Sequence, residues 1–177
     1  EVSVRTLLVD RVVNLLDEGV DVAVRIGALP DSGLTAVPVG QVRRVVCAAP
    51  GFLRQHGEPK DLDALPRFCT ITAAMEGRGT QWRFQQDGQV RRLSVDSQLT
   101  VTSFQAAVLA ACEEWGLTQV VSYQVARHLA SGALQVVLRD FELPPMPVHV
   151  VYPEGRKSSA KVRSFVDFCV DALRRDL

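Results

Sequence analysis

Thr102 and Ser103 place two hydroxyl groups where a predicted strand gives way to the clearest predicted helix of the chain, over 104–115. At a helix N-terminus the backbone N–H groups are free and the helix dipole is positive, so an anion such as a carboxylate is attracted there. The two hydroxyls can add donors, and Phe104 follows them. Thr and Ser are equally suited to capping a helix. The sequence predicts a helix cap, a carboxylate-binding site, or residues that serve as both.

A second group of small and polar residues ends another predicted strand, over 68–72. This group is Thr70, Thr72 and Ala73. In open α/β sheets small ligands bind outside the carboxyl ends of the strands. These residues are therefore candidate ligand contacts.

A third candidate edge lies near the start of the chain. Residues 20–24 are apolar and mostly β-branched, as a strand covered on both faces requires, and Ile26, Gly27 and Ala28 end it. Arg25 could reach a ligand carboxylate as a bidentate donor, or it could point out of the sheet and pair with a surface acid. The sequence leaves both interpretations open.

One further polar residue, Gln119, lies within an otherwise apolar predicted strand over 117–121. Its amide could face a ligand cleft, or it could belong to an ordinary strand surface. The pattern favours neither strongly, so Gln119 is kept as a candidate contact.

Signatures of catalysis are missing from the sequence. His56, His128 and His149 lie far apart, and none is near a nucleophile motif or in metal-ligand spacing. The adjacent acidic pairs at 17–18 and 113–114 lie near predicted helix ends, where neighbouring side chains point in different directions. We predict no catalytic residue, no metal site, no cofactor and no enzymatic activity.

Composition is that of a soluble globular domain. The chain has 177 residues, of which 47% are hydrophobic and 23% charged, and 20 Lys and Arg balance 20 Asp and Glu. Binding of nucleic acid needs a basic surface, so a net charge of zero argues against this segment holding nucleic acid by itself. The arginine doublets at 43–44, 91–92 and 174–175 are scattered and are interpreted as solvated surface.

The four cysteines are spaced too far apart for a zinc motif or a redox C-x-x-C motif. We expect free, buried thiols in a reducing cytoplasm, because a chain of this size can bury a good core without disulfides. No apolar run is long enough to span a membrane, and no signal segment opens the chain. A cytoplasmic protein without a membrane partner is therefore predicted.

The periodicity predicts alternating strands and helices, and hence an α/β fold. Near the start we expect a strand over 2–9, a helix capped by Asp10 with Val12, Val13 and Leu16 on its buried face, and a left-handed stop at Gly19. One long or bent strand is expected over 35–48, and further strands over 68–72, 99–101, 117–121, 134–138 and 148–152. Helices are expected over 50–57, 104–115, 124–130 and 159–173, and a hairpin over 82–93. A turn-rich loop is expected over 28–33, and a glycine-containing loop over 73–79.

Several segments together resemble one known family. They read LLDEGVDVAVRIGALPDSGL, VRRVVCAAPGFLRQHG, WRF, GLTQVVSYQVARHLASGALQVVL and VVYPEGRKSSAKVRSFVDF. In this order they resemble the effector-binding domain of LysR-type transcriptional regulators across nearly the whole chain. Ser122 departs from the family pattern, in which proline is common at that place.

The resemblance implies two Rossmann-like lobes with a ligand cleft between them, as in type 2 periplasmic binding proteins. It places 1–48 and 146–177 in a first, discontinuous lobe and 49–145 in a second, with crossovers near 47–50 and 143–147. It implies that a small-molecule effector binds between the lobes. The expected effector contacts are Val9, Asp10, Ile26, Gly27, Ala28, Thr70, Thr72, Ala73, Thr102, Ser103, Phe104, Leu117 and Gln119.

The resemblance also implies partners. DNA would be bound only through a winged helix-turn-helix module that precedes this segment, and the whole protein would be a homo-oligomer, either a dimer or a tetramer. The family's first βα unit would also precede Glu1, so we expect exposed apolar faces, self-association or a swapped element. Two other functions stay open on the sequence: an extracytoplasmic solute-binding protein of a transporter, and an enzyme built on the same fold.

Overall fold

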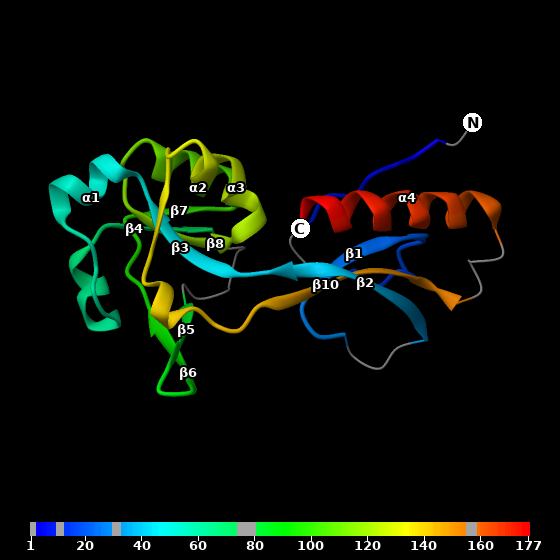
Figure 1. Ribbon diagram of the computed structural model, residues 1–177, viewed down its shortest axis with the longest axis horizontal. Coiled ribbons are helices and arrows are strands. Elements are labelled where there is room, and N and C mark those ends of the chain that lie inside the picture. The colour runs from blue at the N-terminus through cyan, green and yellow to red at the C-terminus, as the bar shows by residue number, and fades with distance from the viewer. Residues whose placement is uncertain (1–2, 10–12, 30–32, 74–80, 155–158) are drawn as a thin grey trace. The chain divides into compact units, whose positions relative to one another are not determined.

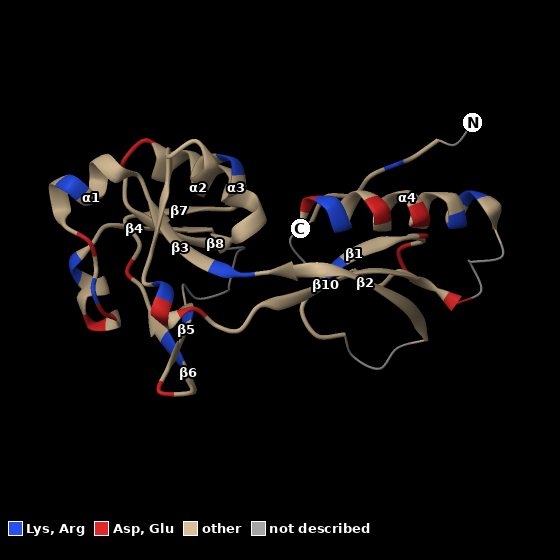
Figure 2. Ribbon diagram, viewed as in Figure 1, with Lys and Arg blue, Asp and Glu red and all other residues tan. Residues whose placement is uncertain are grey.

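The computed structural model describes residues 3–9, 13–29, 33–73, 81–154 and 159–177. Contacts divide the chain into two compact units (Figure 1). Unit 1 comprises Glu1–Val42 and Met146–Leu177, and unit 2 comprises Arg43–Pro145. Basic and acidic residues are interspersed along the ribbons of both units, as the balanced composition predicts (Figure 2).

Unit 1 is built on a three-stranded antiparallel sheet in the order β1-β10-β2. The strands are β1 (Ala23–Ile26), β10 (Met146–Pro153) and β2 (Leu34–Val42). The 17-residue helix α4 (Ala160–Asp176) lies along this sheet and buries Val166 and Val170. The predicted Ser159 cap holds the N-cap position, but its side chain makes no capping hydrogen bond.

The prediction that strand 20–24 is covered on both faces was wrong. The strand is β1, which starts at Ala23 and pairs with β10 in antiparallel register, and its Val24 and Ile26 side chains are 50% and 40% exposed. In the sheet, β10 lies between β1 and β2 and is antiparallel to both, so β1 pairs with no parallel strand among the described residues. The apolar composition of 20–24 therefore does not report burial on both faces.

The predicted strand over 2–9 and the helix that follows it are also wrong where the chain is described. Residues 3–9 have no regular secondary structure and pair with none of the described strands, and residues 15–19 form a turn that leaves Leu16 72% exposed and buries Leu15 instead. Gly19 does adopt the predicted left-handed conformation, with φ at +66°. Asp10, the predicted cap, lies outside the described residues, as do 30–32 and 74–79 of the two predicted loops.

Unit 2 contains a mixed five-stranded sheet in the order β7-β4-β8-β3-β9. Strand β4 is parallel to β7 and β8, and β3 is antiparallel to β8 and β9. The strands are β3 (Arg44–Ala48), β4 (Thr70–Ala73), β7 (Leu99–Val101), β8 (Leu117–Val121) and β9 (Gln135–Val137). The sequence predicts one long or bent strand over 35–48, and the structure divides this segment at Arg43 into β2 and β3, which belong to different sheets.

Two hydrophobic clusters, on opposite faces of this sheet, form the core of unit 2. Helices α2 (Phe104–Cys112) and α3 (Ser122–Ala130) cover one face, where Val45, Val108 and Val125 are fully buried. The other face carries α1 (Pro50–His56), the 3-10 helices η1 (Leu62–Arg67) and η2 (Arg139–Phe141), and the hairpin of β5 (Gln81–Gln86) and β6 (Gln89–Ser94). Odd and even residues of β3 therefore enter different cores, as strand alternation requires.

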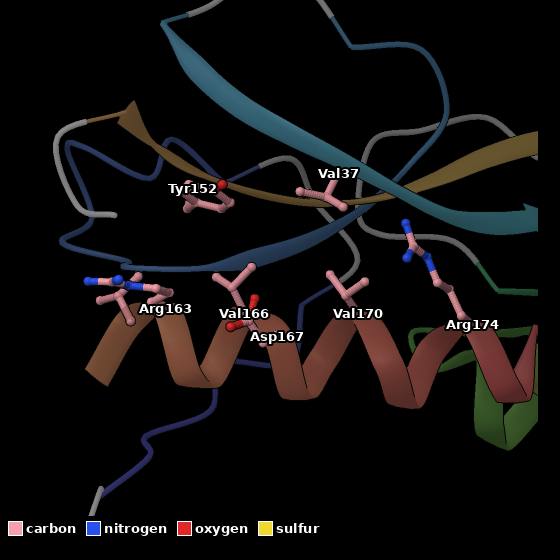
Figure 3. A pocket seen from close by; sticks show the side chains of 8 residues that line it. Val37, Tyr152, Arg163, Val166, Asp167, Val170 and Arg174 are labelled. Atoms are coloured by element: carbon pink, nitrogen blue, oxygen red, sulfur yellow. The ribbon is translucent and has the colours of Figure 1, made fainter. Parts of the chain in front are cut away.

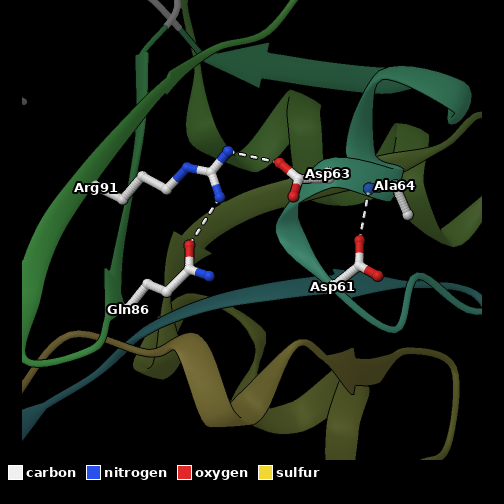
Figure 4. Close-up of polar contacts among 5 residues, drawn as sticks. All are labelled: Asp61, Asp63, Ala64, Gln86 and Arg91. Atoms are coloured by element: carbon white, nitrogen blue, oxygen red, sulfur yellow. Dashed lines mark hydrogen bonds and ion pairs between the residues drawn. The ribbon is translucent and has the colours of Figure 1, made fainter.

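The hairpin confirms its sequence signature. Asp87 and Gly88 have φ values of +51° and +75°, the conformation that a two-residue turn of the favoured hand requires. Outside the turn, Arg91 donates to Gln86 Oε1 at 2.7 Å and forms an ion pair with Asp63 of η1 at 2.6 Å (Figure 4). Asp61 caps η1 through the N–H of Ala64 at 2.8 Å. These contacts tie the hairpin to the neighbouring helix.

The helix predicted over 104–115 ends earlier than the sequence indicates. It stops at Cys112, and Glu114 has a left-handed φ of +63°. Trp115, which the periodicity places on the buried face, is 63% exposed. The apolar period continues beyond the point at which the backbone leaves the helix.

Candidate functional site

The carboxyl ends of three parallel strands form one edge of the sheet in unit 2. Ala73 ends β4 and lies opposite Val101, the last residue of β7, so the chain leaves both strands side by side. Thr102 and Ser103 follow β7 directly and are exposed, and Phe104 begins α2. The structure therefore brings Ala73, Thr102, Ser103 and Phe104 to the same edge, next to the N-terminus of α2.

Ser103 is the N-cap of α2. Its Oγ accepts a hydrogen bond from the backbone N–H of Ala106 at 3.4 Å, and its backbone conformation is extended, as a cap requires. The capping interpretation of this motif is thus confirmed. Ligand contact remains compatible with it, because a single long hydrogen bond leaves a lone pair and the hydroxyl proton of Ser103 available.

Thr70 and Thr72 direct their hydroxyls into the protein. Both are buried, and their Oγ1 atoms lie 3.3 Å and 2.5 Å from Ser97 Oγ. The N–H of Thr70 also donates to Gln98 Oε1 at 2.7 Å. These contacts hold Ser97 and Gln98, which lead into β7, against β4. The two hydroxyls therefore help to fix β7 beside β4. Ser97 and Gln98 carry no sequence motif that would have singled them out.

Leu117 and Gln119 both lie on the hairpin face of β8. Leu117 is fully buried in the core. Gln119 is 8% exposed, and its side-chain amide pairs with the backbone of Arg83: Oε1 accepts from the N–H at 3.2 Å and Nε2 donates to the carbonyl at 3.0 Å. The amide of Gln119 therefore extends the hydrogen bonding of the sheet to β5, an arrangement that neither sequence interpretation foresaw.

The predicted contacts in unit 1 lie around the end of β1. Ile26 and Ala28 are exposed, and between them Gly27, with φ at +104°, donates its N–H to the carbonyl of Pro147 at 2.9 Å. Val9 is 42% exposed in the N-terminal segment. The guanidinium of Arg25 donates to the carbonyl of Val13, a backbone contact that neither sequence interpretation includes.

A cavity in unit 1 lies away from every predicted contact. It has a volume of about 130 Å³ and is lined by Val37, Tyr152, Val162, Arg163, Val166, Asp167, Val170 and Arg174. Figure 3 shows Val37 and Tyr152 of the sheet facing Val166 and Val170 of α4. The cavity thus marks the interface between α4 and the sheet. None of the thirteen residues expected to contact an effector lines it.

The four cysteines are free, but they are not all buried as the sequence predicts. Cys47 is fully buried, Cys112 and Cys169 are half-buried and Cys69 is exposed. Burial, and secondarily the neighbouring Cys112 thiol, raises the pKa of Cys47 to about 12. Burial also raises the pKa of Cys112, whose Sγ lies 3.5 Å from His128 Nδ1, with a smaller contribution from Glu113.

We expect these environments to set the order of alkylation, because the thiolate is the reacting species. Iodoacetamide at pH 8 should label Cys69 at least about tenfold faster than Cys47, with Cys112 and Cys169 between them. Peptide mass spectrometry over a time course measures the four rates, and the chain in denaturant, where the four rates should converge, is the control. Native rates that are equal for Cys69 and Cys47 would contradict the structure.

No metal centre or membrane span is found in the described segments. Their His, Cys, Asp and Glu side chains do not gather in groups of three or more that could hold a metal ion. None of the described helices combines the length and the apolar character that crossing a bilayer would need.

The family follows from a comparison with known proteins. A model of the LysR substrate binding domain matches residues 1–174. The chain belongs to this family. The match covers almost the whole sequence, and it confirms the resemblance that the segments above carry.

Similar proteins are helix-turn-helix regulators. A transcriptional regulator of Xanthomonas campestris is 34% identical to this LysR substrate-binding domain over 170 residues, covering 92% of the chain and 48% of the regulator. The regulator DmlR of Escherichia coli is 32% identical over 162 residues, covering 90% and 52%. The chain spans about half the length of such relatives.

Solved structures agree on the fold. CrgA, a LysR-type regulator of Neisseria meningitidis, superposes with a TM-score of 0.79 at 27% identity, covering 90% of the chain and 54% of CrgA. Full-length AphB of Vibrio cholerae gives 0.78 at 22% identity, covering 94% and 56%. The predicted α/β fold of type 2 periplasmic-binding-protein character is thus confirmed. The comparisons do not favour the alternative of a transporter's solute-binding protein.

Proposed function

We propose that this chain is the effector-sensing domain of a LysR-type transcriptional regulator and that a small organic carboxylate is its effector. The observation that carries the proposal is the family match over residues 1–174, supported by relatives that are about twice as long and are helix-turn-helix regulators. The DNA-binding module would lie in the part of the protein outside this chain.

The sheet edge in unit 2 supports a carboxylate as the ligand. Exposed Thr102 and Ser103 stand at the N-terminus of the nine-residue helix α2, where the free N–H groups and the dipole favour negative charge. Ala73, a small residue that ends β4, lies opposite Val101 at the same edge. The contacts expected in unit 1, from Val9 to Ala28, stay a prediction from the family resemblance.

Sensing would work by a shift of population and would involve no reaction. An effector that binds one conformation of the regulator better than another moves the equilibrium toward the preferred one. The available energy is the difference between its two affinities, typically about 1–3 kcal/mol. In a dimer or tetramer in the cytoplasm, this shift would re-aim the DNA-binding helices.

The ligand class is tested on the 177-residue chain itself. We expect some members of a panel of aliphatic and aromatic carboxylates to raise Tm, and calorimetry then gives Kd. Thr102→Val should weaken binding about tenfold, since a charge-assisted hydrogen bond contributes about 1.5–3 kcal/mol. Ser103→Asp should abolish binding, because Asp retains the cap while placing negative charge at the site.

Thr100→Val is the matched control, since Thr100 is exposed on β7, two residues before Thr102, and its replacement should leave Kd unchanged. Binding that survives Ser103→Asp would exclude this edge as the site. A panel without any binder would count against a carboxylate effector. Sequencing the coding DNA upstream of the Glu1 codon tests the regulator separately, and a winged helix-turn-helix frame is the expected result.

A further inference from the structure

Arg44 belongs to one of the arginine doublets that the sequence predicts to be solvated surface, but its environment does not fit that prediction. It is half-buried, and as the first residue of β3 it shares a sheet face with Val46. The register of β3 and β8 pairs Arg44 with Val121 and Val46 with Gln119, so Arg44 and Gln119 lie on this same face. Val121 is also the carboxyl end of β8. Arg44 therefore belongs to the sheet edge at which parallel strands end.

A second arginine is fixed beside this row. The two hydrogen bonds from Gln119 hold the backbone of Arg83 against the sheet, and the buried Trp82 and Phe84 on either side pack into the core. Across the hairpin, Arg83 lies directly opposite Arg92, and facing residues on paired strands project to the same side. The fold thus places like charges together instead of alternating their signs.

Electrostatics agrees with this placement. The pKa of Arg44 is lowered, first by burial and then by the positive charge of Arg83. Two other arginines form ion pairs with acidic residues. The distance from Arg43 Nη1 to Glu142 Oε2 is 2.8 Å, and the distance from Arg91 Nη2 to Asp63 Oδ1 is 2.6 Å. Within the described segments, no hydrogen bond or ion pair is formed by the guanidinium groups of Arg44, Arg83 and Arg92.

We propose that Arg44 and Arg83 form a binding site for the oxyanion group of a small metabolite, either a carboxylate or a phosphate. Two guanidinium groups provide the paired N–H donors that planar carboxylates and phosphates accept. A half-buried cation without a carboxylate partner is unfavourable, and a bound anion would remove both this cost and the repulsion between the two arginines. The site lies wholly within unit 2. It does not depend on the chain sensing an effector.

Anion binding to the intact 177-residue chain tests the proposal. Sodium phosphate and sodium succinate are compared with sodium chloride at equal ionic strength, by thermal unfolding and by calorimetry. We expect at least one of the two to raise Tm by several degrees and to bind with a measurable Kd. Phosphate alone would identify a phosphorylated ligand, and succinate alone a carboxylate.

Variants Arg44→Gln and Arg83→Gln should each weaken that binding at least tenfold. The matched control is Arg54→Gln on α1, where an exposed arginine is replaced and Kd should not change. In chloride, Arg44→Gln should melt no lower than the parent protein, because it removes a like-charge contact. Absence of anion-specific binding, equal loss in Arg54→Gln, or a lower Tm for Arg44→Gln in chloride would each overturn the proposal.

Discussion

Gly116→Ala is expected to destabilise unit 2 by about 3 kcal/mol or more, because the added methyl group would collide with backbone. A Cβ at this position would lie 2.4 Å from the carbonyl oxygen of Cys69 and 2.8 Å from its carbonyl carbon. The same oxygen accepts the N–H of Leu117 at 2.9 Å, which starts the pairing of β8 with β4. Any shift that relieves the collision therefore disturbs the central strands.

The matched control is Gly132→Ala. Gly132 also has a positive φ, +75°, but a Cβ there would meet no atom within 4 Å, so only the backbone strain of roughly 1–2 kcal/mol remains. Urea unfolding monitored by tryptophan fluorescence reports on unit 2, since Trp82 and Trp115 both lie in it. Equal losses in the two variants would show that contact with Cys69 is not what requires glycine at position 116.

Local signals in the sequence predicted local structure well. The Asp87-Gly88 turn, the start of α1 at Pro50 with its end at the cap Gly57, and the Ser103 cap are each specified by residues close together in the sequence. Their conformations follow from short-range sterics and hydrogen bonding, which a few neighbouring residues determine. These elements were therefore predictable without knowledge of the rest of the chain.

Pairing between distant segments was not predictable in the same way. Alternation over residues 3–9 is compatible with a strand, but a strand also needs a partner, and none of the described strands pairs with them. Likewise, no local pattern shows that Arg25 will bind the carbonyl of Val13. Apolar residues at 20–24 predicted a strand but misjudged its surroundings, because burial depends on the neighbours that the fold supplies.

The candidate site likewise combines features that the local sequence predicts with features that depend on distant segments. The cap at Ser103 and the strand ends at Ala73 and Val101 follow from local pattern and fold class, and the structure places them together. Arg44 was misjudged as solvated, since the charge of a side chain suggests exposure until its strand register is known. The identity of the effector depends on complementarity that the sequence does not encode locally.

Gln119→Leu is expected to detach the hairpin from the sheet and to destabilise unit 2 by about 2 kcal/mol. Leucine fills a similar volume in this buried position but cannot pair with the N–H and carbonyl of Arg83. A two-stranded hairpin is marginal alone, and β5–β6 forms a sheet separate from the other strands. Amide hydrogen exchange of Arg83 should therefore accelerate at least about tenfold, because each 1.4 kcal/mol changes an opening equilibrium tenfold.

The control applies the same substitution at a place away from the hairpin. Gln124→Leu removes one hydrogen bond, from the N–H of Val121 to Gln124 Oε1 at 3.0 Å at the start of α3. It should cost about 1 kcal/mol and leave exchange at Arg83 unchanged. If Gln119→Leu lowers stability while Arg83 stays protected, then packing of Trp82 and Phe84 holds the hairpin in place by itself. In that case the amide of Gln119 contributes to stability without fixing the position of Arg83.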